Sequence, residues 1–298
     1  MAIRDKTGMA FDAWGLIGGL EVALDVDVLV GAYPDRDGPP GTPATVRAML
    51  AAHRIRAGAV ASLRAALFDV RSGNDTTIAL AAPYALAAAD TLTVSGEQTA
   101  PDDLTAADTL AAPNGGAASR GPTAGAAAAF VPVGVVDLRD PVGAGHEMDR
   151  LAAAGVRAVR LFPDEQGVEP GFPSVRHVAR RAARLDMTVL TGGDVRRFWQ
   201  PFAGLEARVV FLDTHFYHLG DFLVAAADEP GFHTSTRLLN SPDALETVAA
   251  ELGADRLLYG SRTPHYEPVV PLLRLATSGL KPDEVAAVAG GNARRLLG

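Results

Sequence analysis

The chain has 298 residues, of which 48% are hydrophobic and 21% are charged, the balance of a globular protein rather than a disordered one. Its formal net charge of −8 leaves no basic surface for nucleic acid or for an anionic membrane. The absence of cysteine excludes disulfides, thiolate nucleophiles and cysteine metal sites. We therefore expect small-molecule partners. We also expect a cytoplasmic location, because we find no convincing signal peptide and no apolar run long enough to span a membrane.

Eight short apolar runs rich in Val and Leu recur along the chain, and segments with helical spacing separate them. The runs cover 22–30, 58–63, 130–138, 156–162, 187–192, 208–214, 232–239 and 256–261. This alternation predicts parallel strands with crossover helices. Eight such units predict an α/β fold, a single-domain (β/α)8 TIM barrel over residues 1–298, although seven or nine units stay open at this level.

Helix boundaries can be read between the strands. Thr42-Pro43 and Ser241-Pro242 each place a capping hydroxyl before a proline that suits the first helical turn. Gly155 and Gly253 follow helical segments as terminators. These signals predict helices outside the strands they connect.

One Ala/Gly-rich segment interrupts the alternation between the second and third strands. It contains little large apolar surface, and 95–125 is predicted to be a flexible insertion. A surface loop is favoured over a substrate lid, because surface loops accept insertions readily.

The predicted strands end in polar residues. In a barrel of this kind the active site lies at the C-terminal ends of the strands. The residues there are Asp27, Arg64, Asp137, Arg160, Thr191, Asp213 with His215, Arg237 and Arg262. The sequence therefore predicts an unusually ionic rim.

Several segments resemble the amidohydrolase-related barrels, the amidohydrolase 2 group of the metal-dependent hydrolases. They are LDVDVLVGAYPDR (24–36), ASLRAALFDVRSGN (61–74), GVRAVRLFPD (155–164), DRLLYGSRTPHYEP (255–268) and GGNARRLLG (290–298). The resemblance covers nearly the whole chain. It implies an eight-stranded barrel and an ancestry of metal-assisted hydrolysis of amides, esters or lactones, or decarboxylation of aromatic acids. Family relatives are often dimers, and a homodimer is one arrangement that the resemblance implies; the oligomeric state stays open.

The metal ligands that the resemblance implies are largely missing. The family has a His-x-His pair after the first strand, where this chain has Asp27 and Leu29. It has an Asp after the eighth strand, where this chain has Arg262. A leucine cannot ligate a metal and a guanidinium repels one. We therefore expect no cofactor; a divalent metal held by Asp27, Asp213 and His215 is the less favoured alternative.

Without a metal, the rim suggests acid–base chemistry on an anionic ligand. His215 is the predicted general acid or base, with Asp213 or Asp27 tuning its pKa. Arg262 is predicted to bind a substrate carboxylate or to pair with Asp27. Three further residues would complete the binding pocket: Arg64, Arg160 and His265.

Two functions remain open from these residues. The first is a hydrolase or lyase that acts on a small carboxylated metabolite. The second is a non-catalytic barrel that binds a small molecule or a partner subunit. In an enzyme His215 should be reachable from solvent and close to a carboxylate, whereas Leu29 and an Arg262–Asp27 pair would fill the site of a dead barrel. Asp25 is predicted to be structural, with hydrogen bonds to the backbone, and Asp27 to face the barrel mouth or lumen.

Overall fold

The computed structural model describes residues 3–4, 10–35, 37–38, 41–81 and 127–298. The predicted insertion at 95–125 lies outside these residues.

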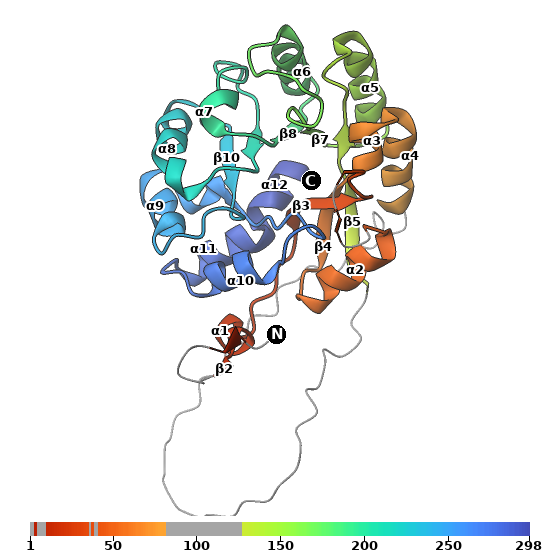
Figure 1. Cartoon of the computed structure of the whole chain (residues 1–298). Helices are drawn as coiled ribbons and strands as arrows, with labels where there is room; N and C mark the ends of the chain where they lie inside the picture. The colour runs from red at the N-terminus through yellow and green to blue at the C-terminus, as the bar shows by residue number, and fades with distance from the viewer. Residues whose placement is uncertain (1–2, 5–9, 36, 39–40, 82–126) are drawn as a thin grey trace, which may run out of the picture.

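The eight predicted strands form a parallel barrel inside a ring of helices (Figure 1). The strands are β3 (Asp25–Val30), β4 (Ala57–Ser62), β5 (Ala129–Pro132) with β6 (Gly134–Val135), β7 (Ala158–Leu161), β8 (Thr188–Thr191), β9 (Val209–Phe211), β10 (Phe232–Ser235) and β11 (Leu257–Leu258). Each lies within or beside the run predicted for it. The TIM barrel is therefore confirmed.

The barrel closes although its hydrogen-bonded strands fall into two groups. One group has the order β3-β4-β5 and the other the order β11-β10-β9-β8-β7-β6. The third predicted strand is split into β5 and β6, and the Val133 amide between them donates to the Val60 carbonyl at 3.0 Å. At the other seam, the amides of Val26 and Leu29 donate to the carbonyls of Tyr259 and Thr263 at 3.0 and 2.8 Å.

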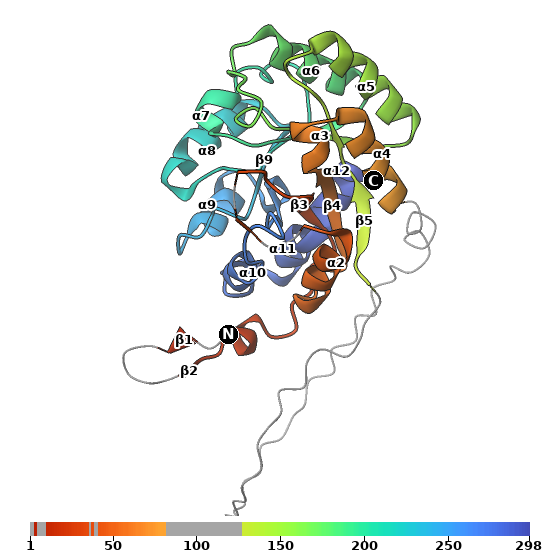
Figure 2. The ribbon, with the colours of Figure 1, turned by 45° about the vertical axis from the view of Figure 1, so that its right-hand side comes forward.

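The helices surround the barrel, and Figure 2 shows α2 and α4 on the outer side of β4 and β5. The helical elements are α1 (Ala13–Ile17), α2 (Pro43–Ala52), α3 (Leu63–Leu67), α4 (Val70–Ala81), α5 (Pro141–Ala153), α6 (Pro173–Arg184), α7 (Val195–Phe198), α8 (Leu219–Asp228), α9 (Ala244–Glu251), α10 (Val269–Ala276), α11 (Pro282–Ala286) and α12 (Asn292–Leu297), with short turns η1 (Phe216–His218), η2 (Ala254–Arg256) and η3 (Ala287–Gly291). A short antiparallel pair, β1 (Ile3–Arg4) and β2 (Ala10–Phe11), precedes them. Among the described helices, none has the length and apolar character needed to cross a membrane.

Most of the predicted helix boundaries are confirmed, and one is wrong. The hydroxyl of Thr42 accepts from the amide of Thr45 at 3.2 Å and caps α2. Gly155 follows α5 with a φ of 81°. Ser241 does not cap α9; the helix begins after Asp243, and the Ser241 hydroxyl donates to the Asp243 carboxylate at 3.1 Å. A turn therefore separates the Ser-Pro pair from the helix.

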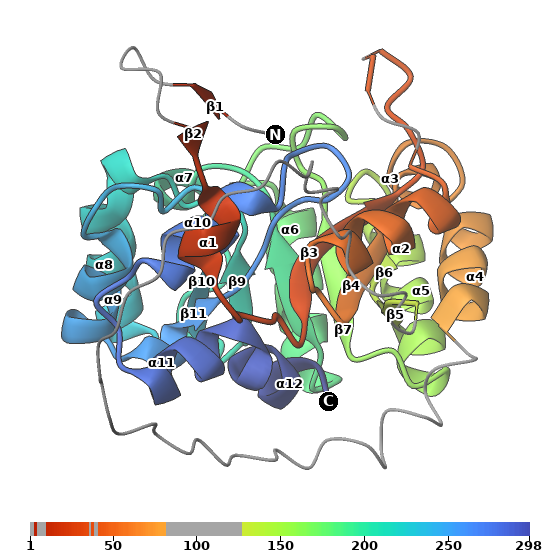
Figure 3. The ribbon, with the colours of Figure 1, turned by 90° about the horizontal axis from the view of Figure 1, so that it is seen from below.

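The apolar core has two layers. The larger one fills the space between strands and helices, and a smaller one fills the barrel interior. Ala293 and Leu297 of α12 belong to the inner layer, and the Thr188 hydroxyl at the start of β8 donates to the Leu296 carbonyl. The helix α12 therefore covers the N-terminal end of the barrel (Figure 3) and leaves the opposite end for a site.

A bulge in β3 separates the two carboxylates of the first strand. In a regular strand, residues 25 and 27 would share a face. Here Asp25 pairs with Gly58 and Val28 pairs with Val60, so β3 has one extra residue between the two pairs. Asp25 can therefore point outward while Asp27 reaches the lumen.

Candidate active site

A pocket of about 770 Å³ opens at the C-terminal end of the barrel. Apart from Leu67 of α3, the described residues that line it lie at or after the C-terminal ends of β3, β7, β8, β9 and β11, which is where parallel strands present their polar ends. They include Tyr33, Asp35, Asp37, Leu67, Arg160, Phe162, Asp164, Glu165, Gly193, Asp213, Arg262, His265 and Tyr266. A cavity of this size suits a small organic molecule.

Asp27 lies below the pocket, fully buried, among three guanidinium groups. Arg160 donates to its Oδ1 at 2.5 Å, and Arg262 donates to its Oδ2 at 3.3 Å. Arg237 Nε lies 3.6 Å from the same Oδ2. The carboxylate of Asp27 on the first strand is thus surrounded by arginines at the ends of the fourth, seventh and eighth strands.

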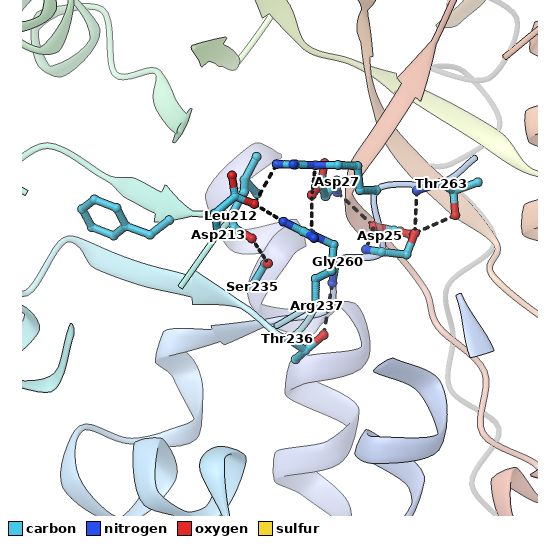
Figure 4. Close-up of polar contacts among 12 residues, drawn as sticks. Asp25, Asp27, Leu212, Asp213, Ser235, Thr236, Arg237, Gly260 and Thr263 are labelled. Atoms are coloured by element: carbon cyan, nitrogen blue, oxygen red, sulfur yellow. Dashed lines mark hydrogen bonds and ion pairs between the residues drawn. The ribbon is translucent and has the colours of Figure 1, made fainter. Parts of the chain in front are cut away.

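Asp213, after β9, is the second carboxylate of the cluster. Arg262 donates to its Oδ1 at 2.8 Å, and Arg237 forms an ion pair with the same atom. Its Oδ2 accepts from the Gly193 amide at 2.9 Å. Gly193 has a φ of 88°, a conformation that glycine adopts without a steric cost. Figure 4 shows Asp27, Asp213 and Arg237 converging at this end of the barrel.

The cluster carries three positive and two negative charges, and these leave one excess positive charge. Arg262, which like Arg237 pairs with both carboxylates, has a φ of 61°, which is uncommon for a residue other than glycine. In this conformation its carbonyl accepts from the His265 amide at 3.0 Å while its side chain pairs with both carboxylates. Burial alone would lower the pKa of Arg262, but Asp27 and Asp213 raise it well above its usual value.

The pKa of Asp27 is set by opposing effects. Burial alone would raise it, but the charges of Arg160, Arg262 and Arg237 together hold it below its ordinary value. Asp27 is therefore a permanent anion near neutral pH and a poor proton acceptor.

Asp25 has the backbone hydrogen bonds that the sequence predicts for it. Its carboxylate accepts from the amides of Asp27 at 2.9 Å and Ser261 at 3.1 Å, and from the Ser261 hydroxyl at 2.5 Å. Burial raises the pKa of Asp25 to about 7, although the hydrogen bonds from Ser261 oppose this rise. The side chain ties the first strand to the eighth beside the site (Figure 4).

The outer part of the pocket is lined by aromatic and acidic side chains instead of arginines. The Tyr33 hydroxyl donates to Glu165 Oε1 at 3.1 Å, and the rings of Tyr33 and His265 meet edge to face at 5.0 Å. Burial, and next the charge of Glu165, raise the pKa of Tyr33 to about 12. Asp164 lies beside Glu165 on the loop after β7.

The structure brings together some of the predicted site residues and not others. Arg160, Asp213, Arg262 and His265 line the pocket, with Asp27 beneath them. Arg64 is an exposed residue of α3 and is not among the lining residues.

His215 also lies outside the lining. Its Nδ1 accepts from the Tyr217 amide at 3.2 Å, and its ring stacks on that of Tyr217 at 4.9 Å. None of the hydrogen bonds of the described residues joins His215 to a carboxylate. Its catalytic role stays a prediction.

Three residues of the site were not singled out from the sequence. Arg237 was noted only as a strand-end residue, although its position after the seventh strand indicates that it faces the mouth. Tyr33 and Glu165 lie on loops, where no periodicity shows which side chains meet.

Arginines occupy the two carboxylates that the sequence offers as alternative metal ligands. Asp27 is engaged by three arginines and Asp213 by two. The described residues contain no group of three or more His, Asp or Glu placed to hold an ion. The guanidinium of Arg262 lies between Asp27 and Asp213, where a cation bridging them would have to lie.

The chain is similar in structure to several solved barrels. An uncharacterized TIM-barrel protein from Bordetella bronchiseptica has a TM-score of 0.64 at 14% identity, with 93% of this chain and 98% of that chain covered. A 5-carboxyvanillate decarboxylase from Sphingomonas paucimobilis has a TM-score of 0.57 at 13% identity, with 94% and 99% covered. A putative amidohydrolase from Staphylococcus aureus has a TM-score of 0.62 at 10% identity, with 92% and 99% covered.

This chain has their fold. The full-length coverage supports the resemblance seen in the sequence at the level of architecture. No sequence-family model matches the chain, and the search of curated proteins found no match. At such low identity the shared fold does not transfer an activity, which must be argued from the site.

Proposed function

We propose that the protein is a hydrolase or lyase that acts on a small carboxylated metabolite in the mouth pocket without a zinc centre. The observation that carries the proposal is a pair of arginines, Arg160 and Arg262, at the bottom of the pocket, which we call the arginine floor. Arg160 and Arg262 line the cavity, and their side chains are 2% and 15% exposed. A guanidinium in such a water-poor site binds carboxylates strongly.

The arginines keep donors for a ligand. Each guanidinium has five N–H donors. The hydrogen bonds of Arg262 to Asp27 and Asp213 use two of them. Arg160 uses one on Asp27 among the described residues. A substrate carboxylate that accepts from these donors would offset the excess positive charge.

The similar structures support this reading of the fold. One of them is a decarboxylase of 5-carboxyvanillate, and another is a putative amidohydrolase. In the present chain, Asp213 and His265 are the predicted site residues that line the pocket and carry a carboxylate or an imidazole. We propose them, together with the predicted acid–base residue His215, as the groups to test for proton transfer.

A non-catalytic, ligand-binding barrel is the second candidate. The pairing of Arg262 with both Asp27 and Asp213 favours it, because those carboxylates are then not available as bases. Leu29 is fully buried in the inner core and offers no ligand atom.

The deciding experiment uses chelator-treated protein and a panel of aliphatic and aromatic carboxylic acids, each with its neutral amide as control. Thermal shift measures binding, and mass spectrometry measures conversion. We expect at least one acid, and not its amide, to stabilise the protein and to be consumed. Binding without conversion would favour the non-catalytic candidate. Conversion that needs an added metal, or no difference between acids and amides, would overturn the proposal.

A further inference from the structure

The mouth pocket has a wall opposite in charge to its floor. Asp164 and Glu165, directly after β7, line it together with Asp35 and Asp37 of the loop after β3. Within the described part of the chain, no Lys or Arg forms an ion pair with Asp164 or Glu165; the nearby Arg197 pairs with Glu169 instead. The carboxylates of Asp164 and Glu165, which form the acidic wall, are therefore not neutralised by arginine within the described residues as those of the floor are.

The acidic wall is electrostatically unfavourable by itself. Partial burial, and next the neighbouring carboxylates of Glu165 and Asp213, raise the pKa of Asp164 above its ordinary value. Carboxylates that crowd one another in this way favour a bound cation. The Tyr33 hydroxyl occupies only one oxygen of Glu165 and holds that side chain against the pocket.

The floor supplies the second, independent observation. Arg160 is 2% exposed and lines the pocket, and its one hydrogen bond among the described residues goes from Nη1 to Asp27. The floor cluster of three arginines and two aspartates has one positive charge in excess. A guanidinium with further N–H donors in a positively charged floor is suited to an anionic group.

We infer that the pocket selects a zwitterion, an aminocarboxylate whose carboxylate lies on Arg160 and Arg262 and whose cationic nitrogen lies on Asp164 and Glu165. The inference rests on the proposed function and narrows its substrate class. A pocket of about 770 Å³ has room for both ends of such a molecule. A ligand with the carboxylate alone would leave the acidic wall uncompensated.

Matched probes test the inference on the full-length protein. Calorimetry compares a series of ω-aminocarboxylates, from 3-aminopropanoate to 6-aminohexanoate, with alkanoates of the same chain length and with alkylamines. We expect at least one aminocarboxylate to bind about tenfold or more tightly than its alkanoate. Equal affinity of the two classes overturns the inference but leaves the proposed function intact, whereas failure of both classes to bind counts against both.

Variants separate the wall from the floor. Glu165→Gln and, independently, Asp164→Asn should each reduce the preference for the aminocarboxylate by about fivefold or more, with little change in the affinity for the alkanoate. Glu251→Gln, an exposed residue of α9 outside the pocket, removes the same charge and should change neither. An unchanged preference in both wall variants, with folding verified by circular dichroism, overturns the inference.

Discussion

Replacement of Asp27 by asparagine tests whether the charge cluster is a stabilising part of the barrel. The change keeps the shape of the side chain and removes one charge. Asp27 is fully buried and lies 2.5 Å from Arg160, 3.3 Å from Arg262 and 3.6 Å from Arg237. The variant would leave Arg237 and Arg262 paired with Asp213 and would leave Arg160 without its ion pair.

The magnitude follows from these distances. At an effective dielectric constant of about 20, each ion contact is worth roughly 5 kcal/mol before desolvation is counted. The cost of burying each ion is several kcal/mol and cancels most of this gain. Removal of one partner leaves the desolvation cost of the others in place, and we expect a loss of about 3–5 kcal/mol in the free energy of unfolding.

Urea denaturation near neutral pH measures this loss. The midpoint should fall while the slope stays constant, because the surface exposed on unfolding is the same. Asp255→Asn is the matched control; its ion pair with Arg256 spans 3.8 Å and its side chain is 60% exposed, so the expected loss is about 1 kcal/mol or less. Equal losses in the two variants would refute the reasoning that the buried cluster stabilises the barrel.

Three further predictions concern pH, metal and a helix cap. Because burial raises the pKa of Asp25 to about 7, from an ordinary value of 3.8 in the unfolded chain, its contribution to stability is complete below about pH 4 and is lost as the pH rises through about 7. The difference in unfolding free energy between Asp25→Asn and the native protein should therefore change by up to a few kcal/mol between pH 5 and pH 8. Urea titrations at both pH values measure it, and a difference that does not depend on pH would contradict this. Dialysis against a chelator should shift the melting temperature by no more than about 1 °C, since a resident metal would stabilise the fold; a larger drop that added metal restores would speak for an ion at the mouth. Thr42→Ala should cost about 1 kcal/mol, measured by urea denaturation, because the Thr45 amide loses its acceptor, whereas a loss near zero would show that water caps α2 equally well.

Much of the barrel could be predicted because its signals are local. Apolar runs of strand length alternate with helical segments, and the Thr42-Pro43 pair marks the start of α2 from neighbouring residues alone. The break between β5 and β6 was not predictable, because it depends on pairing with β4 on one side and β7 on the other. The false cap at Ser241 failed for a similar reason: a turn around Asp243 uses that hydroxyl before the helix starts.

The candidate site was predictable in its composition and less so in its contacts. Parallel strands present their C-terminal ends at one mouth, so Asp27, Arg160, Asp213 and Arg262 were expected to gather there. The position of His215 against Tyr217, away from the pocket lining, depends on the course of the loop after β9. The pair of Tyr33 and Glu165 joins loops 132 residues apart, which no short-range pattern indicates.

The sequence by itself determined which charges stand at the ends of the strands. Only the tertiary structure decided how those charges are paired. The β3 bulge directs Asp25 to Ser261 and Asp27 to the lumen, and the closure of the barrel brings Arg160, Arg237 and Arg262 within reach of Asp27. The physical reason is that ion-pair energies depend on distances of a few ångströms across the lumen, and strand register sets those distances.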